Sequence, residues 1–364
     1  MKVLSIASAR PNFVKLAAVH HALATRGDVE HVIVHTGQHY DPLLSDVFFE
    51  QLHIPQPAEN LGIHGGTREE VIDRTKKALI PVLKKHRPDW VLVYGDVNGA
   101  LGGAQAAKEA GCKLAHVEAG LRSGDMDMPE EHNRIGVDTL ADLLLCTEQS
   151  GVDHLRNEKV KGRIELVGNT MIDTLIRMMP LIRQDPPLNP RETEEGYGIV
   201  TLHRPSNVDN QTTLRRNLSF FIEAMKFRSL ILPMHHRLKN ALDSFQILKP
   251  GEMHELMMAG LHLCPPLGYL QFLSYLNHAS FILTDSGGIQ EEAVLLKKRC
   301  FTLRKNTERP VTIDCGSNVL IDIDKPEDRQ KVLDYAANPT PIDVAIPPLW
   351  DGKAGERIVE ILRG

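Results

Sequence analysis

The sequence predicts an α/β protein with two Rossmann-like, doubly wound parallel-sheet lobes that face a central cleft. Its 364 residues are enough for two domains, each with a core of its own. Short apolar runs rich in β-branched residues alternate with helical stretches, and this alternation is typical of parallel sheets covered by helices on both faces. A stretch rich in proline and polar residues interrupts it, so we expect a first lobe over residues 1–176, a linker over 177–196 and a second lobe over 197–350.

The elements of the first lobe follow from its apolar periodicity. Near-continuous apolar runs predict strands that are buried on both faces, at residues 2–7, 31–36, 90–94, 113–118, 143–147 and 164–167. Apolar residues at helical spacing predict helices at residues 13–24, 67–86, 101–110 and 133–141.

The same alternation restarts in the second lobe. Strands are expected at residues 198–202, 229–233, 262–264, 281–284, 300–303 and 319–321, and helices at 210–226, 269–277 and 289–298. A last helix, 355–362, follows the Pro347-Pro348 break, and we expect the segment 353–364 to pack back on the first lobe. Open α/β sheets bind ligands beyond the carboxyl ends of their strands, so functional side chains are expected there.

The composition excludes several classes of protein. A net charge of −5 with 24% charged and 5% aromatic residues gives neither a basic footprint nor stacking platforms for nucleic acid. No apolar run approaches the ~20 residues of a membrane span, and the amino-terminal segment enters a strand without the features of a signal peptide. The five cysteines lack Cys-x-x-Cys spacing, which favours buried free thiols in a reducing compartment. We therefore expect a cytoplasmic protein with no nucleic-acid or membrane partner.

Residues 284–293 form the clearest candidate for an anion-binding site. A strand that turns through Ser286-Gly287-Gly288 into a helix leaves backbone N–H groups unpaired at the positive end of the helix dipole. The glycines let the backbone approach a phosphate closely. Glu292, expected in the first turn of this helix, would repel a phosphate and is better explained as an acceptor for sugar hydroxyls. Taken alone, Ser-Gly-Gly is better explained by a tight turn before a charged helix start.

Three carboxylates of the first lobe are candidates for acid/base chemistry. Asp96 and Glu118 end two neighbouring predicted strands, so both should face the cleft and could act as an acid/base pair. Glu130 opens a helix in the stretch Pro-Glu-Glu-His-Asn-Arg. A charged residue that merely ends a strand remains an alternative for Asp96, and helix capping remains one for Glu130.

Two arginines are candidates for phosphate binding. Arg10 follows the first strand, where a dinucleotide-binding fold would carry Gly-x-Gly-x-x-Gly, and the absence of this fingerprint speaks against a nicotinamide or flavin cofactor. Arg10 could reach a phosphate or sugar, or it could lie exposed in a loop. Arg309 could neutralise a phosphate or pair with Glu308.

The histidines of the second lobe do not suggest a metal site. His203, at the end of the first strand of this lobe, could serve as an acid/base or as a donor to phosphate. His235 and His236 are adjacent in an expected extended segment and should point to opposite faces, so they cannot chelate together. The second lobe contains no His-x-x-x-His spacing and no Cys/His cluster, and we predict no metal.

Taken together, these stretches strongly resemble the UDP-N-acetylglucosamine 2-epimerase family on the two-lobed fold called GT-B. The resemblance runs nearly end to end, and the order of its motifs makes it specific although each motif alone is weak. The matching stretches are Arg10-Pro11 with Lys15, Thr36-Gly37-Gln38-His39, Gly95-Asp96, 116–122, 129–134, His203-Arg204, 285–292 and 307–310.

The resemblance implies a role for each candidate residue. Ser286, Gly287 and Gly288 would hold the diphosphate, Glu292 the ribose and Phe272 the uracil, although the sequence pattern alone makes Phe272 a core residue. The remaining expected UDP- or substrate-binding residues are Arg10, Lys15, Arg134 and Arg309. Asp96, Glu118, Glu130 and His203 would surround the sugar as the catalytic set. The resemblance also implies a homodimer that acts on a UDP-sugar.

The chemistry of C2 epimerisation agrees with this set. The C2 hydrogen is not acidic, and without a nicotinamide no transient ketone acidifies it, so we expect no cofactor. The workable route is loss of UDP from C1 to give 2-acetamidoglucal, followed by re-protonation and return of UDP. This route needs a stabilised leaving group and two proton carriers. We expect Asp96 and Glu118 to share the proton transfers, with Glu130 and His203 assisting, and which carboxylate removes the proton stays open.

The sequence departs from the family pattern at several positions. Asn12 stands where many members have Glu, and Pro205-Ser206 stands where many have Arg-Glu. In bacterial relatives the Gln-His and His-Arg segments help to form a second UDP-GlcNAc site that activates the enzyme. The candidates for such a regulatory site here are Gln38, His39, Arg204 and His235, and whether the regulation exists stays open.

Four other functions remain alternatives. The stretch from Arg10 to Lys15 favours the non-hydrolysing branch of the family over the branch that releases ManNAc and UDP. The substrate could instead be a UDP-diacetamido-uronic acid. A GT-B glycosyltransferase and a catalytically silent sugar-nucleotide sensor would share the diphosphate site but would not need the acid/base set.

Overall fold

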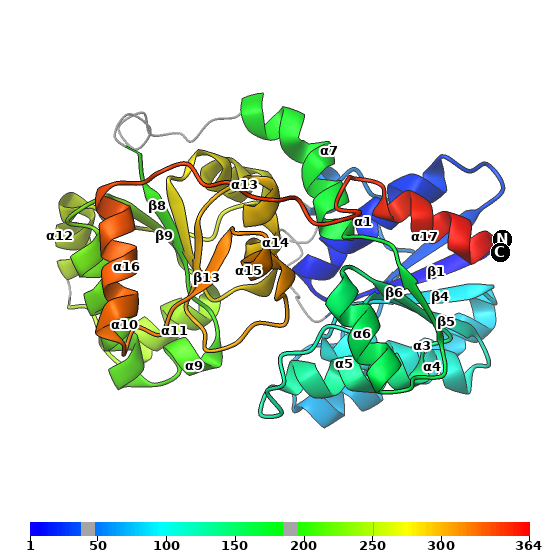
Figure 1. The fold of residues 1–364 in the computed structure, drawn as a ribbon. Helices are drawn as coiled ribbons and strands as arrows, with labels where there is room; N and C mark the ends of the chain where they lie inside the picture. The colour runs from blue at the N-terminus through cyan, green and yellow to red at the C-terminus, as the bar shows by residue number, and fades with distance from the viewer. Residues whose placement is uncertain (38–47, 185–195, 250) are drawn as a thin grey trace. The chain divides into compact units, whose positions relative to one another are not determined.

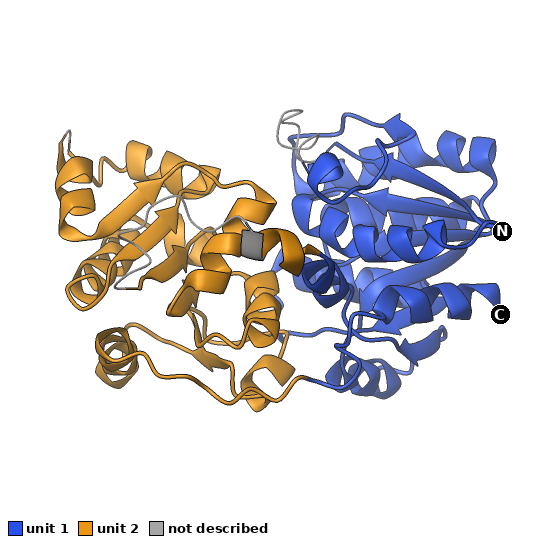
Figure 2. Ribbon diagram, turned by 90° about the horizontal axis from the view of Figure 1, so that it is seen from above, with its two compact units in different colours: residues 1–177, 347–364 blue, residues 178–346 orange. Residues whose placement is uncertain are grey.

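The computed structural model describes residues 1–37, 48–184, 196–249 and 251–364, which fall into two compact units (Figure 2). The first unit comprises Met1–Arg177 and Pro347–Gly364, and the second comprises Met178–Ile346. The linker expected over residues 177–196 is wrong in its first part, because helix α7 (Thr170–Gln184) continues to Gln184 through Pro180. Buried Ile172, Leu175, Met178 and Ile182 at helical spacing outweigh the proline there. Residues 185–195 lie outside the described part of the chain.

A parallel sheet of seven strands in the order β3-β2-β1-β4-β5-β6-β7 forms the centre of the first unit (Figure 1). Its strands are β1 (Lys2–Ala7), β2 (Glu30–His35), β3 (Glu59–Asn60), β4 (Trp90–Tyr94), β5 (Lys113–Ala119), β6 (Leu143–Cys146) and β7 (Arg163–Leu166). The helices besides α7 are α1 (Arg10–Ala24), α3 (Arg68–His86), α4 (Asn98–Glu109), α5 (Pro129–Leu140) and α6 (Gln149–Asn157).

The carboxyl-terminal helix α17 (Ala354–Arg363) belongs to the first unit and lies beside α1 (Figure 1). Gly355 permits this packing, since a Cβ there would lie 2.5 Å from the carbonyl oxygen of Ala18. The Trp90 indole N–H donates to the carbonyl oxygen of Leu362 (3.1 Å), and the Gly355 N–H donates to the Asp173 carboxylate (2.7 Å). These contacts fix the segment after Pro347 to the first unit.

The second unit contains a six-stranded parallel sheet in the order β10-β9-β8-β11-β12-β13. The strands are β8 (Gly198–Thr201), β9 (Leu230–Pro233), β10 (Leu261–Cys264), β11 (Phe281–Thr284), β12 (Cys300–Thr302) and β13 (Asn318–Leu320). The helices are α9 (Pro205–Val208), α10 (Gln211–Ala224), α11 (His236–Ser244), α12 (Glu252–Ala259), α13 (Tyr269–His278), α14 (Gly287–Leu295), α15 (Val311–Asp314) and α16 (Pro326–Ala337).

Every strand predicted from the sequence is present. Central strands such as β4 and β11 are apolar runs that the sheet buries, whereas the edge strand β7 has no fully buried residue. The two-residue strand β3 and several short or polar helices were not predicted, among them α6, α9, α11, α12, α15 and α16. Helices α1, α4, α5 and α14 begin two to four residues before their predicted ranges, and α1 and α5 each have a proline in the first turn. Arg10 and Glu130 are thus helical residues.

Each sheet reverses its strand order once, between β1 and β4 in the first unit and between β8 and β11 in the second. Open α/β sheets bind ligands beyond the carboxyl ends of strands at such points. Asp96 follows β4, and Ser286 follows β11, so both candidate sets lie at these positions.

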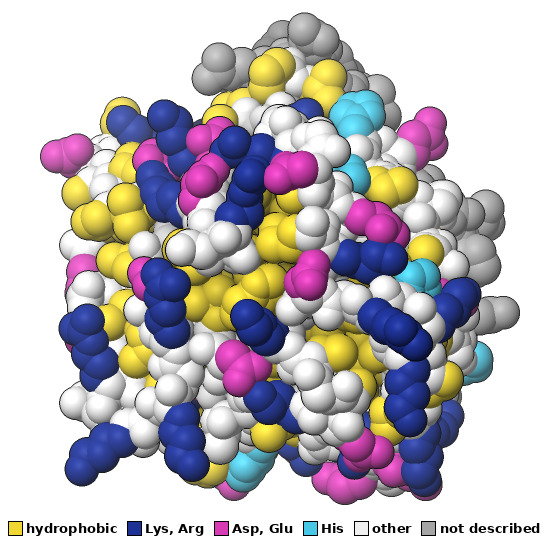
Figure 3. All heavy atoms as spheres, turned by 90° about the vertical axis from the view of Figure 1, so that its right-hand side faces the viewer, with side chains coloured by type: hydrophobic (Ala, Val, Ile, Leu, Met, Phe, Trp, Pro, Cys, Tyr) yellow, Lys and Arg dark blue, Asp and Glu magenta, His cyan; other side chains and the backbone are white. Residues whose placement is uncertain are grey.

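Three further observations concern surface charge, the cysteines and membrane-spanning helices. On the face shown in Figure 3, Lys and Arg side chains are interspersed with Asp and Glu. All five cysteines are free thiols. Within the described residues, no helix is both long and apolar enough to cross a membrane.

Candidate active site

The turn after β4 places Asp96 at the carboxyl edge of the first sheet. Gly95 adopts a left-handed conformation (φ 63°), which a glycine tolerates, and the backbone carbonyl of Asp96 accepts a hydrogen bond from Asn133 Nδ2 (2.8 Å). The Asp96 carboxylate pairs with the guanidinium of buried Arg134, while its own side chain remains 22% exposed. Asp96 is therefore held by a cation and still accessible.

Glu118 lies in a distorted part of the neighbouring strand β5. Its φ of 74° is unusual for a residue with a side chain, and the register of β5 against β6 shifts between Val117 and Ala119. Its Oε1 lies 2.6 Å from Nζ of Lys15, and both side chains are buried. Gly95 leaves room for this ion pair, since a Cβ there would lie 2.9 Å from Nζ. Lys15, expected to bind UDP, is thus placed to hold the Glu118 carboxylate.

The start of α1 is tied to the end of β4 by Asn12. Its Oδ1 accepts the backbone N–H groups of Ser8 and Ala9 (3.0 Å each), and its Nδ2 donates to the carbonyl oxygen of Tyr94 (2.9 Å). Arg10, the first residue of α1, stacks over the ring of Phe48 at 5.7 Å. Asn12, which stands where many family members have Glu, therefore links the end of β1 to the end of β4.

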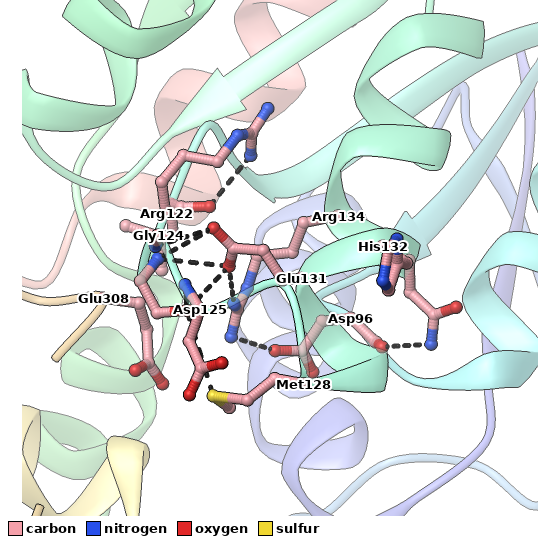
Figure 4. A network of polar contacts seen from close by, with 12 residues as sticks. Asp96, Arg122, Gly124, Asp125, Met128, Glu131, His132, Arg134 and Glu308 are labelled. Atoms are coloured by element: carbon pink, nitrogen blue, oxygen red, sulfur yellow. Dashed lines mark hydrogen bonds and ion pairs between the residues drawn. The ribbon is translucent and has the colours of Figure 1, made fainter. Parts of the chain in front are cut away.

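The two carboxylates of the Pro-Glu-Glu stretch have different surroundings, and Figure 4 shows those of Glu131. Buried Glu131 accepts the backbone N–H groups of Ser123 and Gly124 (both 3.0 Å to Oε1) and pairs with Arg134 (2.8 Å). Burial raises the pKa of Glu131, but these N–H donors and Arg134 outweigh it, so the pKa is lowered. Glu130 is half-buried in the first turn of α5. The sequence reasoning missed Glu131, although its spacing of three residues from Arg134 on a helix is a signal for such a pair.

A second ion pair missed from the sequence lies beneath the Asp96 turn. His116 and Asp138 are fully buried, with Nδ1 2.6 Å from the Asp138 carboxylate and Nε2 2.9 Å from the carbonyl oxygen of Gly95. Burial raises the pKa of Asp138, but His116 and Arg122 outweigh it and lower the pKa. Both ring nitrogens of His116 are therefore engaged, Nδ1 by the Asp138 carboxylate and Nε2 by the carbonyl oxygen of Gly95.

In the second unit, Asp285 joins the ends of β11 and β8. This buried carboxylate accepts the backbone N–H groups of His203 and Arg204 and the side-chain amide of Asn207, and it lies 2.8 Å from Nδ1 of His203. Burial raises the pKa of Asp285, but His203 and the N–H donors outweigh it and lower the pKa to about 2. The sequence reasoning quoted Asp285 as part of a motif without giving it a role.

The Ser286-Gly287-Gly288 turn leads directly into α14, which begins at Gly287 with Ser286 as its N-cap. Gly287 is required by packing, because a Cβ there would lie 2.4 Å from Nη1 of Arg309. Glu292 lies in the second turn of α14, so its expected position in the first turn is wrong; the helix begins two residues earlier than predicted. The greater distance from the helix start weakens its repulsion of an anion bound there.

Arg309 is buried between two carboxylates. Its Nε lies 2.9 Å from Glu291, and its Nη1 donates to Glu308 (2.5 Å). Burial and the Glu291 charge raise the pKa of nearby Glu292 to about 8, and a hydrogen bond with Tyr269 acts in the opposite sense. The alternative that Arg309 pairs with Glu308 is therefore observed, and a second carboxylate joins the pair.

The remaining candidates lie near these groups or outside the described residues. Phe272 is half-buried on α13. Arg204 lies 3.6 Å from Glu308, and the ring of His235, the N-cap of α11, lies 5.4 Å from the ring of His203. Gln38 and His39 are outside the described part of the chain. Among the described residues, no group of three or more His, Cys, Asp or Glu side chains is arranged to hold a metal.

Comparison with known proteins agrees with this geometry. A sequence profile of the UDP-N-acetylglucosamine 2-epimerase family matches residues 21–363. UDP-N-acetylglucosamine 2-epimerase from Methanocaldococcus jannaschii is 36% identical over 369 residues, covering 100% of this chain and 99% of the relative. UDP-2,3-diacetamido-2,3-dideoxy-D-glucuronate 2-epimerase from Pseudomonas aeruginosa is 37% identical over 325 residues, covering 88% of each chain.

A solved structure extends the similarity to three dimensions. The crystal structure of M. jannaschii UDP-GlcNAc 2-epimerase in complex with UDP-GlcNAc and UDP matches with a TM-score of 0.90 at 35% identity, covering 100% of this chain and 99% of that chain. Such neighbours have the GT-B fold, and the predicted class of two parallel-sheet α/β lobes is confirmed. The chain belongs to the UDP-N-acetylglucosamine 2-epimerase family and is an isomerase.

Proposed function

We propose that this protein interconverts UDP-GlcNAc and UDP-ManNAc without releasing the free sugar. The observation that carries the proposal is the pair of carboxylates at the ends of β4 and β5, each beside a buried cation: Asp96 with Arg134, and Glu118 with Lys15. Inversion at C2 addresses both faces of the sugar ring and therefore needs two proton carriers in different positions. A diphosphate-binding protein without epimerase activity would not need them.

The reaction begins with cleavage of the C1–O bond, whose electron pair leaves with the diphosphate. The oxocarbenium-like sugar then loses its C2 proton to one carboxylate, and the C1–C2 double bond of 2-acetamidoglucal forms. The other carboxylate returns a proton to the opposite face of C2, and UDP adds again to C1. Asp96 and Glu118 share these transfers, assisted by Glu130. The carboxylate that removes the C2 proton must be ionised, whereas the one that returns a proton must enter the step protonated.

The second unit supplies the groups that retain UDP. The N–H groups at the start of α14, from Ser286 to Gly288, stabilise the charge that develops on the departing diphosphate. Glu292 accepts the ribose hydroxyls, Phe272 lies against the uracil and Arg10 contacts the nucleotide. Since Arg309 is paired with two carboxylates and packs over Gly287, its contribution is to support the turn that holds the phosphates.

A diacetamido-uronate sugar is the second candidate substrate. The P. aeruginosa relative named for such a substrate is as similar to this chain as the archaeal relative, at 37% against 36% identity. The same elimination and re-addition would serve both sugars, since neither C3 nor C6 takes part in it. Parallel assays with both nucleotide sugars decide between them by kcat/KM.

The deciding experiment is NMR of the protein with UDP-GlcNAc in deuterium oxide. We expect UDP-ManNAc to appear, with deuterium at C2 of both epimers and no free ManNAc. A hydrolysing enzyme would give ManNAc and UDP, a glycosyltransferase without acceptor would give no epimer, and a silent sensor would show no C2 exchange. Asp96→Asn is the matched variant, and full turnover with full exchange in it would remove the assignment of Asp96.

We further propose that the enzyme needs neither a nicotinamide nor a metal and acts as a cytoplasmic homodimer. The elimination route supports the first point, because it contains no redox step. The dimer and the location rest on resemblance to the family. Turnover that persists in EDTA without an added nicotinamide tests whether the enzyme needs a metal or a cofactor. The mass measured by light scattering tests the homodimer.

A further inference from the structure

The environment of Asp285 distinguishes its two carboxylate oxygens. Oδ2 accepts three donors, the backbone N–H groups of His203 (3.0 Å) and Arg204 (2.8 Å) and Nδ2 of Asn207 (3.1 Å). Oδ1 lies 2.8 Å from Nδ1 of His203 and has one longer contact, with the backbone N–H of His203 at 3.2 Å. Asp285 is fully buried, whereas the His203 side chain is 36% exposed. The carboxylate is therefore fixed by backbone donors on one side and presents its other oxygen to the imidazole.

We propose that Asp285 is a positioning residue whose carboxylate holds the His203 imidazole in the tautomer with its proton on Nδ1, so that Nε2 is the nitrogen that exchanges a proton with the substrate. Among the described residues, no hydrogen bond engages Nε2 of His203. A proton taken up at Nε2 gives an imidazolium whose Nδ1–H still faces the carboxylate, so Asp285 also stabilises the charged ring. The role of His203 at the substrate rests on the proposed function, whereas its tautomer does not.

The geometry predicts what an amide would do at this position. In Asp285→Asn, three donors face the site of Oδ2, so the amide oxygen must lie there and the NH₂ group must take the place of Oδ1. That NH₂ donates toward Nδ1 of His203, which must then accept. The ring is forced into the Nε2–H tautomer with little change in shape or packing. Cationic His203 becomes unfavourable, because its Nδ1–H would face another donor.

The first test is the tautomer of His203 in the full chain without substrate. Long-range ¹H–¹⁵N correlation spectra distinguish the two tautomers, and His203→Gln identifies the signal among the 17 histidines. We expect the neutral wild-type ring to be protonated on Nδ1 and the Asp285→Asn ring on Nε2. An Nε2–H ring in the wild-type protein would overturn the proposal, and this outcome does not depend on the variant folding or on enzyme activity.

The second test is a kinetic double-variant cycle. We expect Asp285→Asn to lower kcat by about 10²-fold or more while KM for UDP-GlcNAc changes little, since the histidine acts by proton transfer. His203→Gln should cost about as much, and adding Asp285→Asn to it should cost little more. Independent, multiplicative losses in the double variant would show that Asp285 acts elsewhere.

Asn207→Ala is the matched control. It removes one donor from Oδ2 of Asp285 and leaves the carboxylate facing the imidazole. We expect His203 to keep the Nδ1–H tautomer in this variant, even if thermal stability falls. If Asn207→Ala changed the His203 tautomer as much as Asp285→Asn does, general loosening of the loop, and not the carboxylate, would determine the tautomer.

Discussion

Each unit contains a histidine paired with a buried aspartate at the carboxyl edge of its sheet, but the two pairs differ in what they leave available. In the first unit, His116 is fully buried and engages Asp138 with one nitrogen and the carbonyl oxygen of Gly95 with the other. In the second unit, His203 engages Asp285 through Nδ1 and remains 36% exposed.

The difference shows that a histidine–aspartate pair does not by itself indicate chemistry. His116 has no nitrogen left to exchange a proton with a ligand, so its role is to brace the turn that carries Asp96. His203 has one nitrogen held and an accessible ring, which is the arrangement that proton transfer requires. The four predictions below test this division between bracing and chemistry, beginning with the largest expected effect.

Replacing the carboxylate beside Lys15 should have the largest effect on catalysis. Glu118→Gln keeps the shape of the side chain but removes its capacity to accept a proton, so we expect kcat to fall by about 10³-fold. Initial rates of UDP-ManNAc formation measure the loss, and C2 exchange in deuterium oxide shows whether proton removal itself is lost. A rise in KM alone, with kcat preserved, would assign Glu118 to binding.

The second prediction concerns pH. Burial and the Glu291 charge raise the pKa of Glu292 from 4.5 to about 8, so the folded protein binds more protons than the unfolded chain between these values. The stability contributed by protonated Glu292 is complete below pH 4.5 and is lost as pH rises to about 8, by up to about 5 kcal/mol. Urea unfolding of Glu292→Gln, which cannot ionise, should depend less on pH in this window. An unchanged slope would show that Glu292 is not the group responsible.

The third prediction separates the two histidines by stability. His116→Gln removes one of the partners of buried Asp138 and leaves Arg122 at 2.8 Å from the carboxylate, so we expect a loss of about 2 kcal/mol in the free energy of unfolding. His203→Gln replaces an accessible ring and should cost less than about 1 kcal/mol. Urea unfolding checks both values. When kcat is calculated per folded molecule, we expect His203→Gln to lower it more than His116→Gln does. Equal destabilisation would erase the distinction between a bracing and a reacting histidine.

The smallest effect is expected for nucleotide binding. Glu292→Ala removes an acceptor for the ribose hydroxyls but no proton carrier, so UDP should bind about tenfold more weakly, equivalent to about 1.4 kcal/mol. Calorimetric titration with UDP measures this change, and kcat at saturating substrate should fall less than the affinity does. UDP affinity equal to that of the unaltered protein would remove the ribose role of Glu292.

The sequence by itself determined the strands and hence the edges at which functional groups must lie. Central strands such as β4 and β11 are apolar runs, and burial on both faces of a parallel sheet requires such a run, so the signal is local. Asp96 and Ser286 could be placed because each directly follows such a strand. The short polar helices, such as α16, escaped prediction because few of their side chains are buried, Val332 and Ala336 in that case.

Only the tertiary structure decided which charged groups pair. Lys15 and Glu118 are 103 residues apart, and His203 and Asp285 are 82 apart, so no local pattern reveals either contact. The structure also divided Glu130 from Glu131, because only Glu131 reaches the donors of the preceding loop. Burial strengthens such pairs and penalises any charge left without a partner. The strand-end residues therefore follow from the sequence, whereas the partners that fix their charge and tautomer follow from the fold.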